Sequence, residues 1–296
     1  IMGNSMGGEF SKSLALRVRF REVLKALDAD PILADMDVET RAALHDRIEA
    51  RLAAELPPVD VDSMPGLLSN VVAGRVASWL DWMGGNMTVD AACAASLAAV
   101  AVAVDWLRSG RCDAVLTGGV DTDLAPETFV GFCRTGALSH SGSSPFSVHA
   151  DGFVMGEGCA VLAMKRLDDA LRDGDPVWAV LRGIGQSSDG RGRSITAPRA
   201  AGQRLALQRA YAEVDFGPES VGMVEAHGTG TSLGDATEVA VLSEHFRKRT
   251  QPVWLGSVKS MLGHLKAGAG AAGLTKAVLA VATGVIPPTL HAGPLN

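Results

Sequence analysis

Apolar residues recur at every fourth position near the start of the chain, where charged residues fill the gaps. The repeat runs from Asp37 to Leu56 through Leu44, Ile48 and Leu52, and Pro57-Pro58 ends it. Positions four apart lie on one face of a helix, so the pattern predicts an amphipathic surface helix. We assign it to a helical insert at about residues 28–62 and favour a structural role for it over a docking role.

Beyond this insert, short apolar runs alternate with segments rich in alanine and glycine. The runs are "NMTVD", "DAVLTGG", "AVLAMKRL", "VWAVLRGIG", "VGMVEA" and "VWLGS", and helices are expected over Cys93 to Arg108 and over 200–213. This alternation predicts an α/β protein with largely buried sheets. The charged stretch "KRLDDALRDGD" runs into a proline turn, which indicates a boundary between residues 1–174 and 175–296.

Length and composition set the scale of the protein. A chain of 296 residues with 47% hydrophobic content can bury a large core. It opens with Ile1 rather than methionine and closes on "HAGPLN" without a charged tail. We therefore expect a fragment that lacks structure at both ends.

Charge and cysteine usage exclude several classes of function. The net charge of −6 argues against a nucleic-acid binder, although all 33 acidic residues precede His245 and six basic ones follow it. That basic end is either solvated surface charge, which we favour, or a contact for an acidic partner. Four cysteines without CxxC or metal-ligand spacing, and no signal peptide, indicate reduced thiols in a cytoplasmic protein without a metal site. No apolar run reaches the roughly 20 residues that span a membrane.

Three candidate reactive side chains each follow a short apolar run. Cys93, His227 and His264 are expected at the carboxyl ends of strands, the edge where ligands bind in α/β sheets. Cys93 also opens a predicted helix, whose dipole would stabilise the thiolate and lower its pKa. A buried structural cysteine is the alternative. Cys112, Cys133 and Cys159 have no such placement, so we expect them to be packing residues.

The surroundings of the two histidines are polar and small. His227 lies in "EAHGTGT", where Thr229 and Thr231 offer hydroxyl groups to a polar ligand. His264 lies in "VKSMLGH", five positions after Lys259. Each histidine alone would more often be structural, but two at matching strand ends favour a site. The nearby "GAGAAG" matches a dinucleotide-binding pattern, yet it lacks a preceding strand and a following acid, so we interpret it as a closely packed helix.

These motifs together resemble the β-ketoacyl synthase family of thiolase-fold condensing enzymes. "VDAACAAS" resembles the family's cysteine motif, "EAHGTGT" and "VKSMLGH" its two histidine motifs, and "PFSVHADGFVMGEG" the segment between them. Residues 3–20 and 67–80, and the stretch "SSDGRGRSITAPR", are most similar to ketosynthases of iterative polyketide, polyunsaturated-fatty-acid and enediyne synthases.

The resemblance implies a five-layered αβαβα fold of two similar halves, working as a homodimer within a multidomain synthase. It implies that Cys93 is acylated, that His227 and His264 promote decarboxylation, and that Lys259 and Glu238 support them. Thr229 and Thr231 would hold the phosphopantetheine arm of acyl carrier protein, and no cofactor would be bound directly. The implied reaction joins an acyl thioester on cysteine to a malonyl unit with loss of carbon dioxide.

Two departures and two alternatives accompany this resemblance. The cysteine is followed by Ala-Ala-Ser where many relatives have serines, and "PFS" stands where an aspartate is common. The Gly-Phe-Gly-like loop that completes the family's oxyanion hole is absent from the sequence. A non-catalytic subunit that sets chain length, or a Cys-His hydrolase, remain alternatives.

Overall fold

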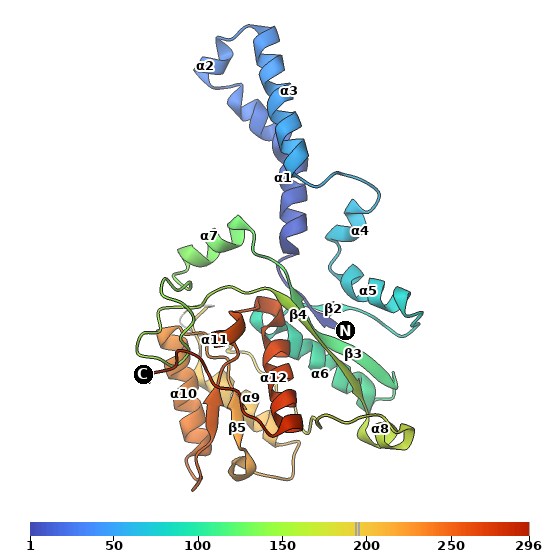
Figure 1. Ribbon diagram of the computed structural model, residues 1–296, viewed down its shortest axis with the longest axis vertical. Coiled ribbons are helices and arrows are strands. Elements are labelled where there is room, and N and C mark those ends of the chain that lie inside the picture. The colour runs from blue at the N-terminus through green and yellow to red at the C-terminus, as the bar shows by residue number, and fades with distance from the viewer. Residues whose placement is uncertain (193, 195, 296) are drawn as a thin grey trace.

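The computed structural model describes residues 1–192, 194 and 196–295, and it has mixed α/β architecture (Figure 1). The strands are β1 (Met2–Gly3), β2 (Thr88–Val89), β3 (Ala114–Asp121), β4 (Gly158–Lys165), β5 (Met223–Glu225) and β6 (Trp254–Gly256). The helices are α1 (Gly8–Leu27), α2 (Pro31–Ala34), α3 (Val38–Glu55), α4 (Ser63–Leu67), α5 (Asn70–Trp79), α6 (Ala95–Arg108), α7 (Pro126–Arg134), α8 (Leu167–Asp173), α9 (Ala200–Tyr211), α10 (Ser232–Phe246), α11 (Lys259–Leu262) and α12 (Ala269–Thr283). Short 3₁₀ turns are η1 (Ala92–Ala94), η2 (Pro218–Ser220) and η3 (Lys266–Gly268).

The strands form two separate sheets. The larger has the order β2-β1-β3-β4, in which only the β3–β4 pair is antiparallel, and the smaller pairs β5 with β6 in parallel. The central position of β1 was not predicted, because two strand residues at the very start carry no periodic signal.

Helices α6 and α12 form a layer between the two sheets. Helix α6 packs on β1, β2 and β3, while α12 contacts α6, β3, β4 and β5. Small residues allow this close approach: a Cβ on Gly3 would lie 2.4 Å from the Ser96 nitrogen, and one on Gly270 would lie 2.5 Å from Cγ of Leu97. The sheet, helix, sheet order gives the inner three layers of the expected architecture, and "GAGAAG" lies in the closely packed helical segment that we predicted.

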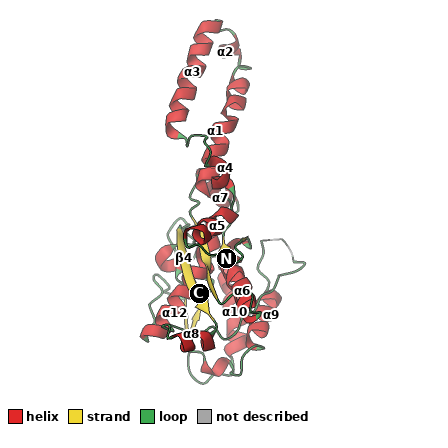
Figure 2. Cartoon of the chain, turned by 90° about the vertical axis from the view of Figure 1, so that its right-hand side faces the viewer, coloured by secondary structure: helices red, strands yellow, loops and turns green. Residues whose placement is uncertain are grey.

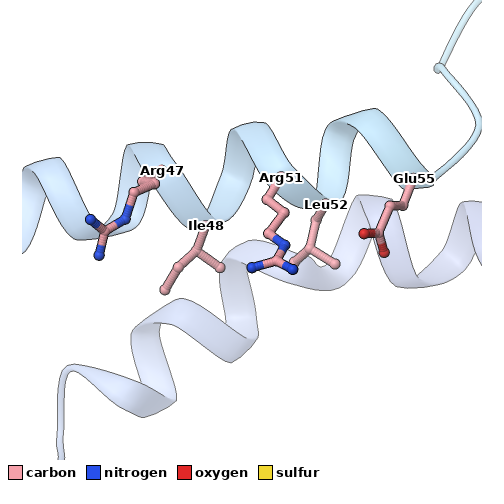
Figure 3. A pocket seen from close by; sticks show the side chains of 5 residues that line it. All are labelled: Arg47, Ile48, Arg51, Leu52 and Glu55. Atoms are coloured by element: carbon pink, nitrogen blue, oxygen red, sulfur yellow. The ribbon is translucent and has the colours of Figure 1, made fainter.

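A long helical hairpin projects from this body (Figures 1 and 2). Its second helix, α3, matches the predicted amphipathic helix, and the Asp37 carboxylate caps it by accepting a hydrogen bond from the Thr40 N–H at 2.8 Å. Ile48 and Leu52 of the apolar stripe line a groove facing α1 (Figure 3). The hairpin begins at Gly8, earlier than the predicted insert, because α1 has no strict four-residue apolar repeat.

Two predictions about strands are wrong. The run "VWAVLRGIG" forms no strand, and its side chains at Val177, Trp178 and Val180 are exposed. Instead it passes beside α9, where a Cβ on Gly183 would lie 2.5 Å from the Ala210 carbonyl oxygen. The larger sheet is also less buried than expected, because β4 alternates half-buried with exposed residues.

Candidate active site

Cys93 lies in the 3₁₀ turn that connects β2 to α6. The Asp90 carboxylate shapes this turn by accepting a hydrogen bond from the Ala92 N–H at 2.9 Å, and Ala92 has a left-handed φ of 49°. The turn contacts η3, which begins two residues after His264. Cys93 is half-buried, and the charged groups that act on its thiol are Lys259, Asp121 and Lys266. The fold therefore joins the cysteine to the second histidine motif.

The pKa of the Cys93 thiol is raised, contrary to the sequence-based prediction. Burial is the largest cause, since it disfavours the charged thiolate, and the Lys259 ammonium only partly offsets it. Cys93 also stands in the 3₁₀ turn before α6 rather than in the first turn of that helix. The helix-dipole argument consequently overestimated how far the thiolate is stabilised.

His264 is almost wholly buried, with 2% of its surface exposed. It does not directly follow β6 as predicted, because α11 intervenes, and its backbone instead bridges to Met155. The Lys266 backbone N–H donates to Nδ1 of His264 at 2.9 Å. Nδ1 is therefore an acceptor, which places the proton of the neutral ring on Nε2. Burial, together with the Lys259 ammonium, lowers the pKa of His264 to about 2.

His227 stands beside His264, with ring centroids 5.5 Å apart and planes at 87°. The residue as a whole is exposed, although many protein atoms surround its ring. This crowding and the Lys259 ammonium lower the pKa of His227, so both imidazoles are neutral at pH 7. Two neutral rings meeting at an edge can present hydrogen-bond donors to one substrate oxygen.

Glu238 and Lys259 hold the His227 loop from opposite sides. Glu238 accepts hydrogen bonds from the N–H groups of His227 and Gly228 at 2.7 and 2.8 Å. Lys259, of which 4% is exposed, donates from its ammonium to the His227 carbonyl oxygen at 2.6 Å. Burial lowers the pKa of Lys259 and raises that of Glu238. The structure thus brings together five of the residues singled out from the sequence, namely Cys93, His227, Glu238, Lys259 and His264.

Thr229 and Thr231 point their hydroxyl groups toward each other, with oxygens 3.0 Å apart. The turn between them is fixed by Asp235, which accepts hydrogen bonds from the N–H groups of Gly230 and Phe146 at 3.1 and 2.7 Å. The left-handed φ of 76° at Gly230 suits glycine. The two hydroxyls form one polar edge beside the histidine loop.

Asp121 and Lys266 were missed by the sequence analysis. Both are buried, and the Lys266 ammonium lies 3.0 Å from Oδ1 of Asp121. Asp121 ends β3, but the predicted strand stopped at Gly119, so its place at a strand end went unnoticed. Lys266 was counted only within a basic region.

That basic region and the other cysteines also need correction. Three of its six basic residues, Lys259, Lys266 and Lys276, are buried within the core, so they are not solvated surface charge as favoured. Cys112 packs against a core cluster as expected, whereas Cys133 and Cys159 are exposed. Cys159 is exposed because its side chain lies on the face of β4 whose residues are open to solvent.

Comparison with known proteins identifies the family. Residues 38–170 match the family model described as "Beta-ketoacyl synthase, N-terminal domain". Residues 178–293 match the family model described as "Beta-ketoacyl synthase, C-terminal domain". The chain belongs to the β-ketoacyl synthase family.

Relatives of this family include large synthases. One subunit of the phenolphthiocerol/phthiocerol polyketide synthase of Mycobacterium tuberculosis is 44% identical over 82% of this chain and 13% of its own length. One subunit of the polyunsaturated fatty acid synthase of a Thraustochytrium species is 42% identical over 80% of this chain and 9% of its own. The chain therefore spans a small part of these curated relatives.

A solved structure shows the same fold. The ketosynthase from module 6 of the bacillaene synthase of Bacillus subtilis 168 has a TM-score of 0.75 and 36% identity, covering 78% of this chain and 42% of that one. The α/β fold is thus thiolase-like, as the resemblance implied. The motif "SSDGRGRSITAPR" includes positions 193 and 195, which lie outside the described residues.

Membrane spans and metal clusters are both missing from the part of the chain that the structure describes. Among residues 1–192, 194 and 196–295, no helix is both long and apolar enough to cross a membrane. Within the same ranges, no group of three or more His, Cys, Asp or Glu side chains is placed to hold a metal ion.

Proposed function

We propose that this chain is a β-ketoacyl synthase that condenses an acyl group on Cys93 with a malonyl unit on acyl carrier protein. The observation that carries the proposal is the pair of neutral imidazoles at His227 and His264, with the His264 proton on Nε2, on the side of the fold where the Cys93 turn packs. A thiol beside two hydrogen-bond donors suits thioester chemistry better than either feature alone.

In the first step, Cys93 attacks the carbonyl carbon of an acyl thioester. The new carbon–sulfur bond forms as the bond to the carrier sulfur breaks, and the thiol proton passes to the departing carrier thiolate. Because burial raises the pKa of Cys93, the nearby Lys259 and Lys266 ammonium groups are needed to stabilise the developing thiolate. The Thr229 and Thr231 hydroxyls would bind the phosphopantetheine arm.

In the second step, the malonyl thioester loses carbon dioxide. The electron pair of the broken carbon–carbon bond becomes an enolate, whose oxygen gains negative charge. The Nε2–H of His264 and a ring N–H of His227 would donate to that oxygen. Their low pKa values keep both rings neutral, which leaves their protons in place as hydrogen-bond donors.

In the last step, the enolate carbon attacks the Cys93 thioester and the cysteine sulfur leaves. The product is a β-ketoacyl group on the carrier, and the thiolate regains a proton from solvent. The Cys93 backbone N–H would supply one donor to the tetrahedral oxyanion. We include in the proposal a homodimer and a place within a multidomain synthase, which the resemblance implies.

Incubation with acyl and malonyl carrier protein, followed by mass spectrometry of the carrier and of the Cys93 peptide, tests the proposal. The proposal predicts an acylated Cys93 and a β-ketoacyl carrier. Free acid released without malonyl substrate would favour a hydrolase, and an unmodified Cys93 would favour a non-catalytic role. Either result contradicts the proposal.

A further inference from the structure

The root of the helical hairpin is anchored in the core by one ion pair. Lys12 of α1 lies 2.5 Å from Oδ2 of Asp123, whose side chain is 1% exposed. The Thr128 hydroxyl donates to the same carboxylate oxygen at 2.7 Å and also contacts the Lys12 ammonium. Although burial opposes ionisation, the hydrogen bonds from Lys12 and Thr128 lower the pKa of Asp123.

Asp123 is connected in turn to the residues beneath the candidate site. Its backbone N–H donates to Oδ1 of Asp121 at 3.0 Å, and the same oxygen lies 3.0 Å from the Lys266 ammonium. The other oxygen of Asp121 accepts from the Ala267 N–H at 3.3 Å. Lys12, Asp123, Asp121 and Lys266 therefore form two ion pairs joined through one backbone hydrogen bond.

Lys266 connects Asp121 to His264, because its ammonium pairs with Asp121 and its backbone N–H bonds the imidazole. Its left-handed φ of 47° is strained for a residue with a side chain, so the contacts around it must hold it in place. The ammonium is bonded to Asp121 and to the Gly156 carbonyl oxygen at 2.8 Å, while the backbone N–H fixes Nδ1 of His264. A shift of Asp121 would release the group that determines which imidazole nitrogen carries the proton.

We propose that Lys12 is a positioning residue, through which the root of the helical hairpin holds the Asp123–Asp121–Lys266 linkage and hence the geometry of His264 and Cys93. The expected effect on the decarboxylation rate rests on the proposed function, whereas the expected effect on the geometry of His264 and Cys93 does not. The hairpin thereby contributes to the site without touching the substrate.

The positive charge of Lys12 is what this linkage depends on. Without its ammonium, the buried Asp123 carboxylate has no cationic partner among the residues that the structure describes, so the 121–128 segment must shift or Asp123 must take up a proton. The charged and titratable groups around Cys93 are Lys259, Lys266 and Asp121, with His227 and His264 beside them. A shift of the 121–128 segment moves the Lys266 ammonium away from the Cys93 thiol, and because that ammonium lowers the pKa of Cys93, its displacement raises this pKa further.

The test uses the full-length protein with Lys12→Met, Lys12→Arg and Asp123→Asn substitutions. The exposed Arg19→Gln, which breaks an ion pair with Glu22 on the same helix, is the matched control. Two quantities are measured: the rate of malonyl decarboxylation, and the pH dependence of Cys93 alkylation by iodoacetamide, followed by mass spectrometry of its peptide. Circular dichroism verifies that each variant is folded.

The linkage predicts that Lys12→Met lowers kcat for decarboxylation about 10-fold with KM unchanged, less than the roughly 100-fold loss from a misplaced reacting group. The alkylation profile moves to higher pH by about half a unit. Lys12→Arg should keep the wild-type kcat and alkylation profile, and Asp123→Asn should change both as Lys12→Met does. The double variant Lys12→Met/Asp123→Asn should show no larger change than either single variant.

Two outcomes overturn the inference: a folded Lys12→Met protein that equals the wild type, or one that loses activity with an unchanged alkylation profile. If the wild type decarboxylates nothing, the proposed function fails. The shift of the alkylation profile would then still establish the linkage.

Discussion

The Lys266 backbone N–H donates to Nδ1 of His264, and this single hydrogen bond fixes the imidazole as the Nε2–H tautomer. The ring is buried, and its pKa is lowered to about 2, so it remains neutral at every pH at which the protein would work. A neutral, oriented donor is what an enolate oxygen requires.

Replacing His264 with glutamine should separate decarboxylation from acylation. The substitution replaces the ring Nε2–H, which the Lys266 N–H orients, with the amide of a flexible side chain, and it leaves Cys93 and its turn in place. We expect malonyl decarboxylation to fall by about 100-fold to 1,000-fold, as for loss of one donor to an oxyanion. Acylation of Cys93, followed by mass spectrometry, should fall by less than about 10-fold. Equal losses in both steps would contradict the assigned role.

Buried His264 should also make the fold sensitive to acid. Its folded pKa of about 2 lies below the ordinary value of 6.5, so below pH 6.5 the unfolded chain takes up a proton that the folded protein does not. This contribution is present in full above pH 6.5 and is lost as the pH falls. Between pH 7 and 5 it should reduce the free energy of unfolding by about 2 kcal/mol.

Urea unfolding at the two pH values measures this effect. The decrease in the free energy of unfolding between pH 7 and 5 should be about 2 kcal/mol smaller in His264→Gln than in the wild type. In the control His140→Gln, where an exposed histidine is replaced, this decrease should equal that of the wild type. An equal decrease in all three proteins would show that His264 is protonated in the fold.

Lys259 should control the reactivity of Cys93. Its ammonium lowers the pKa of the thiol against the opposing effect of burial. Lys259→Met should therefore slow iodoacetamide alkylation of Cys93 at pH 8 by about 10-fold, equivalent to one pKa unit. The exposed Lys248→Met is the control for charge alone. Unchanged alkylation in Lys259→Met would refute this electrostatic role.

The threonine pair should affect substrate binding more than chemistry. Thr231→Val removes one of two adjacent hydroxyls, and we expect KM for the malonyl carrier to rise about 10-fold while kcat changes less than about 2-fold. Thr237→Val is a matched control, because that hydroxyl donates to the Leu233 carbonyl oxygen within α10. A lower kcat with unchanged KM would place Thr231 in the reaction itself.

The sequence predicted the elements that carry strong local signals. The four-residue repeat of α3 and the small-residue runs at Cys93 and "GAGAAG" all became helices. The residues brought together at the site were predicted through the motifs, whose polar side chains follow short strands.

The errors arose where tertiary contacts override local pattern. "VWAVLRGIG" has the composition of a buried strand but lacks a strand partner within the described residues. The raised pKa of Cys93 depends on burial, which no helix-dipole argument from sequence includes. Asp121 and Lys266 meet across 145 positions, so no spacing in the sequence indicates their pairing.

The most direct test of the account compares the wild type with Cys93→Ala and Cys112→Ala in one condensation assay. Each is incubated with acyl and malonyl carrier protein, and the β-ketoacyl carrier is quantified by mass spectrometry. The account predicts product from the wild type and from Cys112→Ala, where the replaced side chain packs against a core cluster, and none from Cys93→Ala. Undiminished product from Cys93→Ala would contradict the central claim.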